Sequence, residues 1–67
     1  MVEAEDWRAR LRGLRLTLGW SQRRLAREFR VTVGAVSQWE SGKRGVPGPV
    51  RRLTELYERG VVRPIRS

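Results

Sequence analysis

The 67-residue chain contains no cysteine and no histidine. Disulfide bonds and zinc sites built from these residues are therefore excluded, so apolar packing and helix caps have to hold the fold. No apolar run reaches the roughly 20 residues that a membrane-spanning helix needs, and the N-terminal MVEAEDW is too acidic for a signal peptide. We therefore expect one small, soluble, cytoplasmic domain with no metal and no cofactor.

Acidic residues are also few. Seven Asp and Glu stand against fifteen Lys and Arg, which gives a formal net charge of +8, and fourteen of the fifteen basic residues are arginine. A small domain this basic tends to bind a polyanion, most often a phosphate backbone, and arginine can form paired hydrogen bonds to phosphate or to guanine. A solvated arginine-rich surface without such a partner is the alternative.

Apolar residues recur at helical spacing in four stretches of the chain. Helices are predicted at about residues 4–18, 22–29, 33–41 and 49–59. The sequence thus predicts an all-α domain over residues 1–60. Residues 61–67 place Pro64 among β-branched side chains, which predicts an extended tail rather than another helix.

Turn chemistry marks the ends of the middle helices. Ser21 and Thr32 are suited to cap the starts of the second and third helices, and Gly42 is suited to end the third. Arg30 follows the second helix where a glycine would be easiest, so we expect left-handed, strained backbone there. Two short capped helices separated by a tight turn match the description of a helix-turn-helix.

The apolar positions of the four helices also predict the core. The residues expected to face it are Trp7, Leu11, Leu14, Leu18, Leu25, Ala26, Phe29, Val36, Trp39, Val50, Leu53, Leu56 and Tyr57. Three tryptophans raise the possibility of stacking on single-stranded nucleic acid. Because Trp7 and Trp39 lie on apolar faces and Trp20 lies in a turn, core packing is the better interpretation for all three.

One ordered set of residues spans most of the chain, from about Leu11 to Leu56. Its members are Arg15, Gly19-Trp20-Ser21-Gln22, Leu25-Ala26, Val31, Val36 and Glu40-Ser41-Gly42. At these spacings the set resembles the phage repressor and Cro family of helix-turn-helix regulators, also called the xenobiotic-response-element-like family. The resemblance implies a compact four-helix domain of the lambda-repressor-like type, without the fifth helix that the family often has. An ordinary small helical bundle with matching caps is the alternative.

The resemblance also implies which residues would contact DNA. The third helix would enter the major groove. The positions that would face base edges are Val33, Gly34, Ser37 and Gln38. The positions that would contact phosphates are Gln22, Arg23, Lys43 and Arg44, with Arg24 and Arg27 as weaker candidates. Arg15 and Glu40 resemble the family's partly buried ion pair. For Val33 and Gly34, simple exposure or packing of a turn is the alternative.

Two functions follow as hypotheses. The first is a sequence-specific regulator of transcription, of the repressor type, that binds double-stranded DNA as a dimer on paired half-sites and is associated with the nucleoid. The second is a protein-interaction module, such as an adaptor, an antitoxin-like partner or a co-regulator. An enzyme is not expected, because the few acidic residues lie at a helix start or are spaced as surface charges or ion-pair partners.

Overall fold

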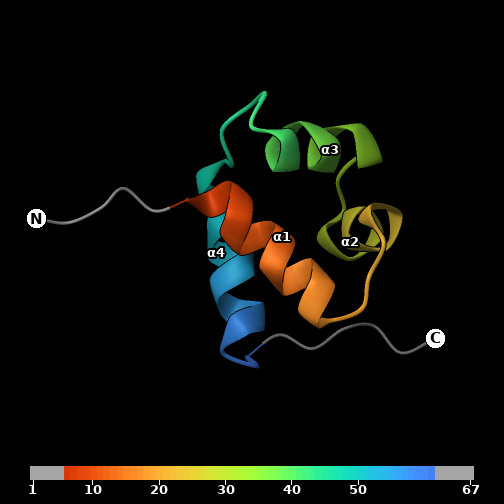
Figure 1. Ribbon diagram of the computed structural model, residues 1–67. Coiled ribbons are helices and arrows are strands. Elements are labelled where there is room, and N and C mark those ends of the chain that lie inside the picture. The colour runs from red at the N-terminus through yellow and green to blue at the C-terminus, as the bar shows by residue number, and fades with distance from the viewer. Residues whose placement is uncertain (1–5, 62–67) are drawn as a thin grey trace, which may run out of the picture.

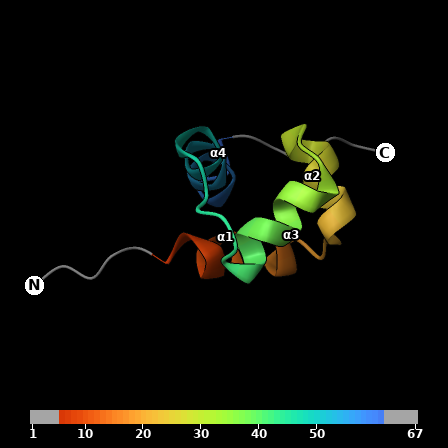
Figure 2. The same ribbon diagram turned by 90° about the horizontal axis from the view of Figure 1, so that it is seen from above.

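The computed structural model describes residues 6–61, which form four α-helices and no strand. The helices are α1 (Trp7–Thr17), α2 (Gln22–Phe29), α3 (Val33–Ser41) and α4 (Gly48–Glu58). The predicted all-α, four-helix fold is confirmed. α1 packs against both α3 and α4, and α2 packs against α3. As Figures 1 and 2 show, α3 therefore lies along one edge of the molecule, with α4 on the other side of α1 from α2.

Side-chain caps set the starts of the first three helices. The Oγ of Ser21 accepts a hydrogen bond from the N–H of Arg24 at 3.0 Å, and the Oγ1 of Thr32 accepts one from Ala35 at 3.1 Å, as predicted. Asp6 caps α1 in the same way, so that helix begins at Trp7 rather than near residue 4. Residues 1–5 lie outside the described part of the chain, and so do 62–67, which hold most of the predicted tail.

Three of the helices end in the same pair of backbone hydrogen bonds, the Schellman motif. The residue in the left-handed position is Gly19 after α1, Arg30 after α2 and Gly60 after α4. Arg30, at φ 58°, is the one residue other than glycine with a positive φ in the described part. The predicted left-handed backbone is confirmed, and it brings Val31 back to bond the carbonyl of Ala26 at 2.9 Å.

The core contains most of the predicted residues. The buried apolar residues are Leu11, Leu14, Trp20, Leu25, Ala26, Phe29, Val36, Trp39, Val46 and Val50. Val46, in the loop before α4, was not among the predicted ones. Trp20 and Trp39 are only 8% and 6% exposed, so their rings pack in the core as interpreted. Trp7, Leu18, Leu53 and Tyr57 are half-buried and pack against this core, whereas the prediction for Leu56 is wrong, because Leu56 is half-buried without packing against it. Thr54 is fully buried instead, and its hydroxyl donates to the carbonyl of Val50 at 2.8 Å.

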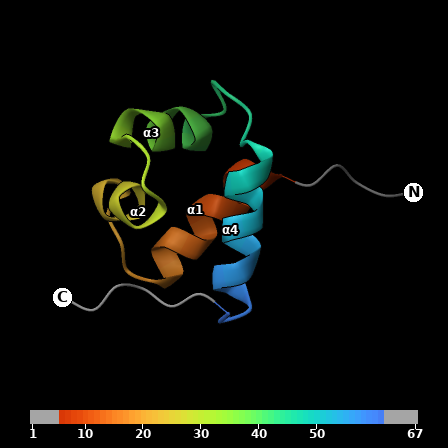
Figure 3. The same ribbon diagram turned by 180° about the vertical axis from the view of Figure 1, so that it is seen from behind.

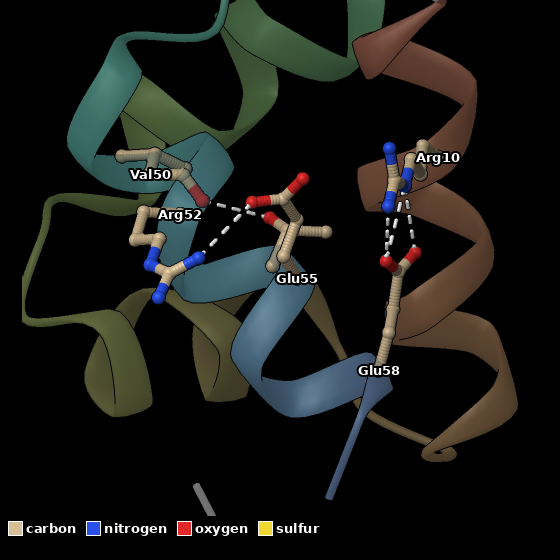
Figure 4. Close-up of polar contacts among 6 residues, drawn as sticks. Arg10, Val50, Arg52, Glu55 and Glu58 are labelled. Carbon is tan, nitrogen blue, oxygen red and sulfur yellow. Dashed lines mark hydrogen bonds and ion pairs between the residues drawn. The ribbon is translucent and has the colours of Figure 1, made fainter. Parts of the chain in front are cut away.

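A surface ion pair fastens α1 to α4. The Nε of Arg10 lies 3.0 Å from both carboxylate oxygens of Glu58, and its Nη2 lies 2.7 Å from Oε1 (Figure 4). The same guanidinium lies over the ring of Trp7, 4.3 Å from its centroid. About a third of each charged side chain is exposed, so the pair contributes less than about 1 kcal/mol to stability.

The left-handed Arg30 generates a stability prediction. Replacing it with glycine removes the roughly 1–2 kcal/mol that left-handed backbone costs an L-residue, offset by about 0.5–1 kcal/mol of extra chain entropy in the unfolded state. Arg30→Gly should therefore raise the free energy of unfolding by about 0.5–1 kcal/mol, measured by urea denaturation. The matched control is Arg27→Gly, inside α2, which should lower it by about 1 kcal/mol. Equal effects from both variants would contradict the assignment.

Candidate nucleic-acid interface

One side of α3 is exposed at the surface of the domain. Its inner side buries Val36 and Trp39, whereas Val33, Gly34 and Ser37 are exposed and Gln38 is half-buried. The outer side lies at the edge of the molecule, as Figures 1 and 3 show. All four predicted base-contact positions are thus on α3, with Gln38 the least accessible of them.

Gly34 is not required by the packing of the domain. A Cβ added there would meet no atom closer than the Oγ1 of Thr32, at 4.0 Å. A glycine inside a helix costs about 1 kcal/mol relative to alanine. Packing of the turn therefore does not explain this residue. Gly34 instead leaves the outer surface of the first turn of α3 without a side chain.

A buried carboxylate joins three helices beneath this surface. The Nε of Arg15 lies 2.7 Å from the Oε2 of Glu40 and its Nη2 lies 3.0 Å from Oε1, while the two side chains are 12% and 5% exposed. The Nη1 of Arg15 donates to the carbonyl of Trp20 at 2.8 Å. The Nε2 of Gln22 donates to the Oε1 of Glu40 at 3.1 Å. The structure thus brings Arg15 and Glu40 together and adds Gln22 to the pair.

The network leaves Gln22 able to bind a further group. Its Nε2 carries two hydrogens, and one of them is directed at Glu40. The side chain also lines a surface hollow together with Ser37, which we call the Gln22 hollow; its lining residues are Arg12, Arg15, Gln22, Ser37, Glu40 and Ser41. A predicted phosphate-contact residue and a predicted base-contact residue therefore share one depression between α2 and α3.

Arg12 is a member of this hollow that the sequence interpretation missed. It is exposed, and no carboxylate in residues 6–61 pairs with it. The sequence did indicate that Arg12 shares a helical face with Arg15, because residues three apart in a helix lie on one face. Without the packing of α1 against α3, nothing indicated that this face borders Gln22.

The other predicted phosphate contacts lie at the two flanks of the motif. Arg23 is exposed on the first turn of α2. Lys43 and Arg44 are exposed directly after α3, where the N–H of Arg44 donates to the carbonyl of Gln38 at 3.2 Å and holds the turn. The weaker candidate Arg24 is half-buried, and its Nε donates to the buried carboxylate of Glu28 at 2.9 Å.

Glu28 is a buried acid that the sequence interpretation did not single out. It accepts from Arg24 one helical turn earlier, whose guanidinium also lies 5.3 Å from the centroid of the Trp20 ring. Burial, followed by the negative charge of Glu28 and a hydrogen bond to it, raises the pKa of Tyr57 above its ordinary value. The Tyr57 ring stacks on Phe29, so this network joins α2 to α4.

These features define a helix-turn-helix protein: two short capped helices, a tight left-handed turn, and a second helix with one side exposed. A model of the helix-turn-helix domain family matches residues 8–63, most of the chain, and the protein belongs to that family. A search of curated proteins found no match, and neither did a search of solved structures. The family match points to a DNA-binding regulator in general.

Two further observations bear on the class of site. Within residues 6–61, no helix is long and apolar enough to cross a membrane. Over the same range, no group of three or more acidic, histidine or cysteine side chains is placed to hold a metal ion.

The buried carboxylate generates a second stability prediction. Glu40→Ala leaves the largely buried charge of Arg15 without its partner, so the free energy of unfolding should fall by about 3–5 kcal/mol. The matched control is Glu58→Ala, which breaks the more exposed pair with Arg10 and should cost less than about 1 kcal/mol. Thermal unfolding followed by circular dichroism measures both. Similar losses would show that the Glu40 pair does not join the helices as described.

Proposed function

We propose that this protein is a sequence-specific regulator of transcription that binds double-stranded DNA in the manner of the phage repressor and Cro family. The exposed side of α3 next to the Gln22 hollow is the observation that carries the proposal. An α-helix fits the major groove of B-form DNA when one side of it is free, and the adjoining helix then meets the backbone. α3 has such a side, and α2 begins at Gln22, beside it.

The base contacts follow from the chemistry of the outer side of α3. The amide of Gln38 can form two hydrogen bonds with adenine, and the hydroxyl of Ser37 can donate or accept with little selectivity. Val33, 45% exposed, can contact the methyl group of thymine. Gly34 lets the backbone approach the bases closely. Only Gln38 offers a strongly discriminating contact, so a single copy would read few base pairs.

The phosphate contacts supply most of the affinity in this proposal. Gln22 and Arg23 would hold one flank of the groove, together with Arg12, which borders the same hollow as Gln22. Lys43 and Arg44 would hold the other flank. Neutralising about four phosphates with Arg12, Arg23, Lys43 and Arg44 weakens binding roughly a hundredfold between about 50 and 200 mM salt. The formal charge of +8 supports such a contribution.

We further propose that two copies act together on paired half-sites and that binding represses transcription. One copy with so sparse a set of base contacts would not select a site among the many in a genome. Pairing two copies doubles the number of base pairs read and fixes the spacing of the half-sites. A cytoplasmic location in association with the nucleoid is part of the same proposal.

A protein-interaction module is the second candidate, favoured by the apolar start of α3. Val33 is exposed there beside the side-chain-free surface of Gly34, an arrangement that also suits contact with a protein. Under this alternative, the protein is an adaptor, an antitoxin-like partner or a co-regulator. The outer side of α3 then contacts another protein and binds DNA weakly or not at all. The experiment below separates the two.

Selection from random duplex pools, followed by titration of the recovered sequence between 50 and 200 mM salt, tests the proposal. The wild-type protein should bind, with the salt dependence given above. Gln38→Ala should lose about 1–3 kcal/mol of discrimination at one position of the site, because it removes a bidentate base contact. Lys43→Ala should weaken all sequences alike and lower the salt slope by about 1.

Arg59→Ala is the control, because Arg59 follows α4 at the end of the molecule away from α3 (Figure 1). It should leave the discrimination unchanged. A wild-type protein that selects no duplex at about 100 mM salt would overturn the proposal and leave the protein-interaction module. Equal effects of Gln38→Ala and Lys43→Ala on sequence preference would remove the base-contact assignment alone.

A further inference from the structure

A second surface hollow is lined by residues from the end of α3, the start of α1 and the first turns of α4, and three of these residues are arginines. They are Arg8 near the start of α1, Arg44 in the loop after α3, and Arg51 in the first turns of α4. The rings of Trp7 and Trp39 also line it. We call it the arginine hollow. No residue of the α2–turn–α3 unit other than Trp39 and Gly42, at the end of α3, belongs to it.

Two of the three guanidinium groups lie against uncharged parts of the protein. The Nε of Arg51 donates to the carbonyl of Val46 at 2.8 Å, and its guanidinium carbon lies 5.6 Å from the centroid of the Trp7 ring. The side chain of Arg8 covers Gly42, with its Nη1 2.6 Å from where a Cβ on that glycine would be. Neither contact neutralises a positive charge, so the guanidinium groups of Arg8 and Arg51 can still bind an anion.

The charge of the hollow is almost uncompensated. None of its lining residues is acidic. Arg8 forms an ion pair between its Nε and the Oδ1 of Asp6, at 3.8 Å, but both side chains are more than half exposed, so this pair is weak. On α1, the nearby Arg10 is already matched by Glu58. The arginine hollow is thus a concentration of positive charge beside the predicted phosphate contact Arg44.

From this arrangement we infer that the arginine hollow binds a phosphate group, and that its source is the DNA backbone next to the end of α3. The inference rests on the proposed function for that source, whereas a free phosphate would satisfy the same chemistry. It adds Arg8 of α1 and Arg51 of α4 to the DNA-contacting residues, outside the helix-turn-helix unit itself. The planar forks of arginine suit the oxygen atoms of phosphate.

The first arm of the test uses no DNA. Inorganic phosphate is titrated into the ¹⁵N-labelled protein at constant ionic strength, with chloride as the competing anion, and the side-chain signals of Trp7 and Arg51 are followed by NMR. Both signals should shift with phosphate, and Arg8→Gln should reduce the shift severalfold. Arg8→Lys keeps a positive charge and should retain most of it. Unchanged signals in the wild-type protein would overturn the inference.

The second arm uses the random duplex pool. Arg8→Gln should lower the slope of log affinity against log salt by about 1, since one phosphate contact is lost. Arg59→Gln removes the same charge at the far end of α4 and should change the slope much less. Circular dichroism melting of both variants shows whether each is folded, and Arg44→Gln provides a second probe of the hollow if Arg8→Gln is not.

The two arms distinguish the possible failures. If the wild-type protein binds DNA while Arg8→Gln and Arg59→Gln give equal slopes of log affinity against log salt, the arginine hollow does not bind the DNA backbone. That result would not contradict the proposed function. Phosphate-dependent shifts in a protein that binds no duplex would support a site for free phosphate and overturn the proposed function instead. Shifts together with a slope change specific to Arg8→Gln would support the whole inference.

Discussion

The arrangement of this small domain depends on the burial of one negative charge. A carboxylate removed from water is strongly destabilising unless hydrogen-bond donors surround it. The Glu40 carboxylate receives two donors from Arg15 and a third from Gln22. These residues belong to α3, α1 and α2, so this charge is satisfied when three helices occupy their native positions. In a domain with so short a chain and no disulfide bond, the contact links the elements that form the exposed side of α3.

The same contact organises the charge of the surface. In the Gln22 hollow, Arg15 is paired with the buried carboxylate, so the groups left for a ligand are the Gln22 amide, Ser37 and Arg12. In the arginine hollow, no carboxylate lines the surface. If the arginines were spread uniformly over the surface, the two hollows would not differ in their content of carboxylates. Acidic partners thus divide the arginines into those that hold the fold and those available to a polyanion.

Much of the fold could be predicted from the sequence because it depends on residues close in the chain. The caps formed by Ser21 and Thr32, and the left-handed Arg30, each involve groups within one or two helical turns. The errors concern burial. Leu56 was expected in the core and Thr54 was not, because a hydroxyl that bonds its own helix can be buried at little cost. The spacing of apolar residues predicts which face of a helix is turned toward the core. How the helices cross then decides which residues on that face are buried.

The sequence by itself determined the four helices, the turn between α2 and α3, and the strong positive charge, since composition and local hydrogen bonding specify these. Only the tertiary structure decided which arginines serve which purpose. Arg10 and Arg15 lie on one short helix, yet their carboxylate partners come from α4 and α3. Arg8 and Arg51 lie far apart in the chain and line one hollow. Contacts of this kind depend on how the helices pack, which no local pattern of residues specifies.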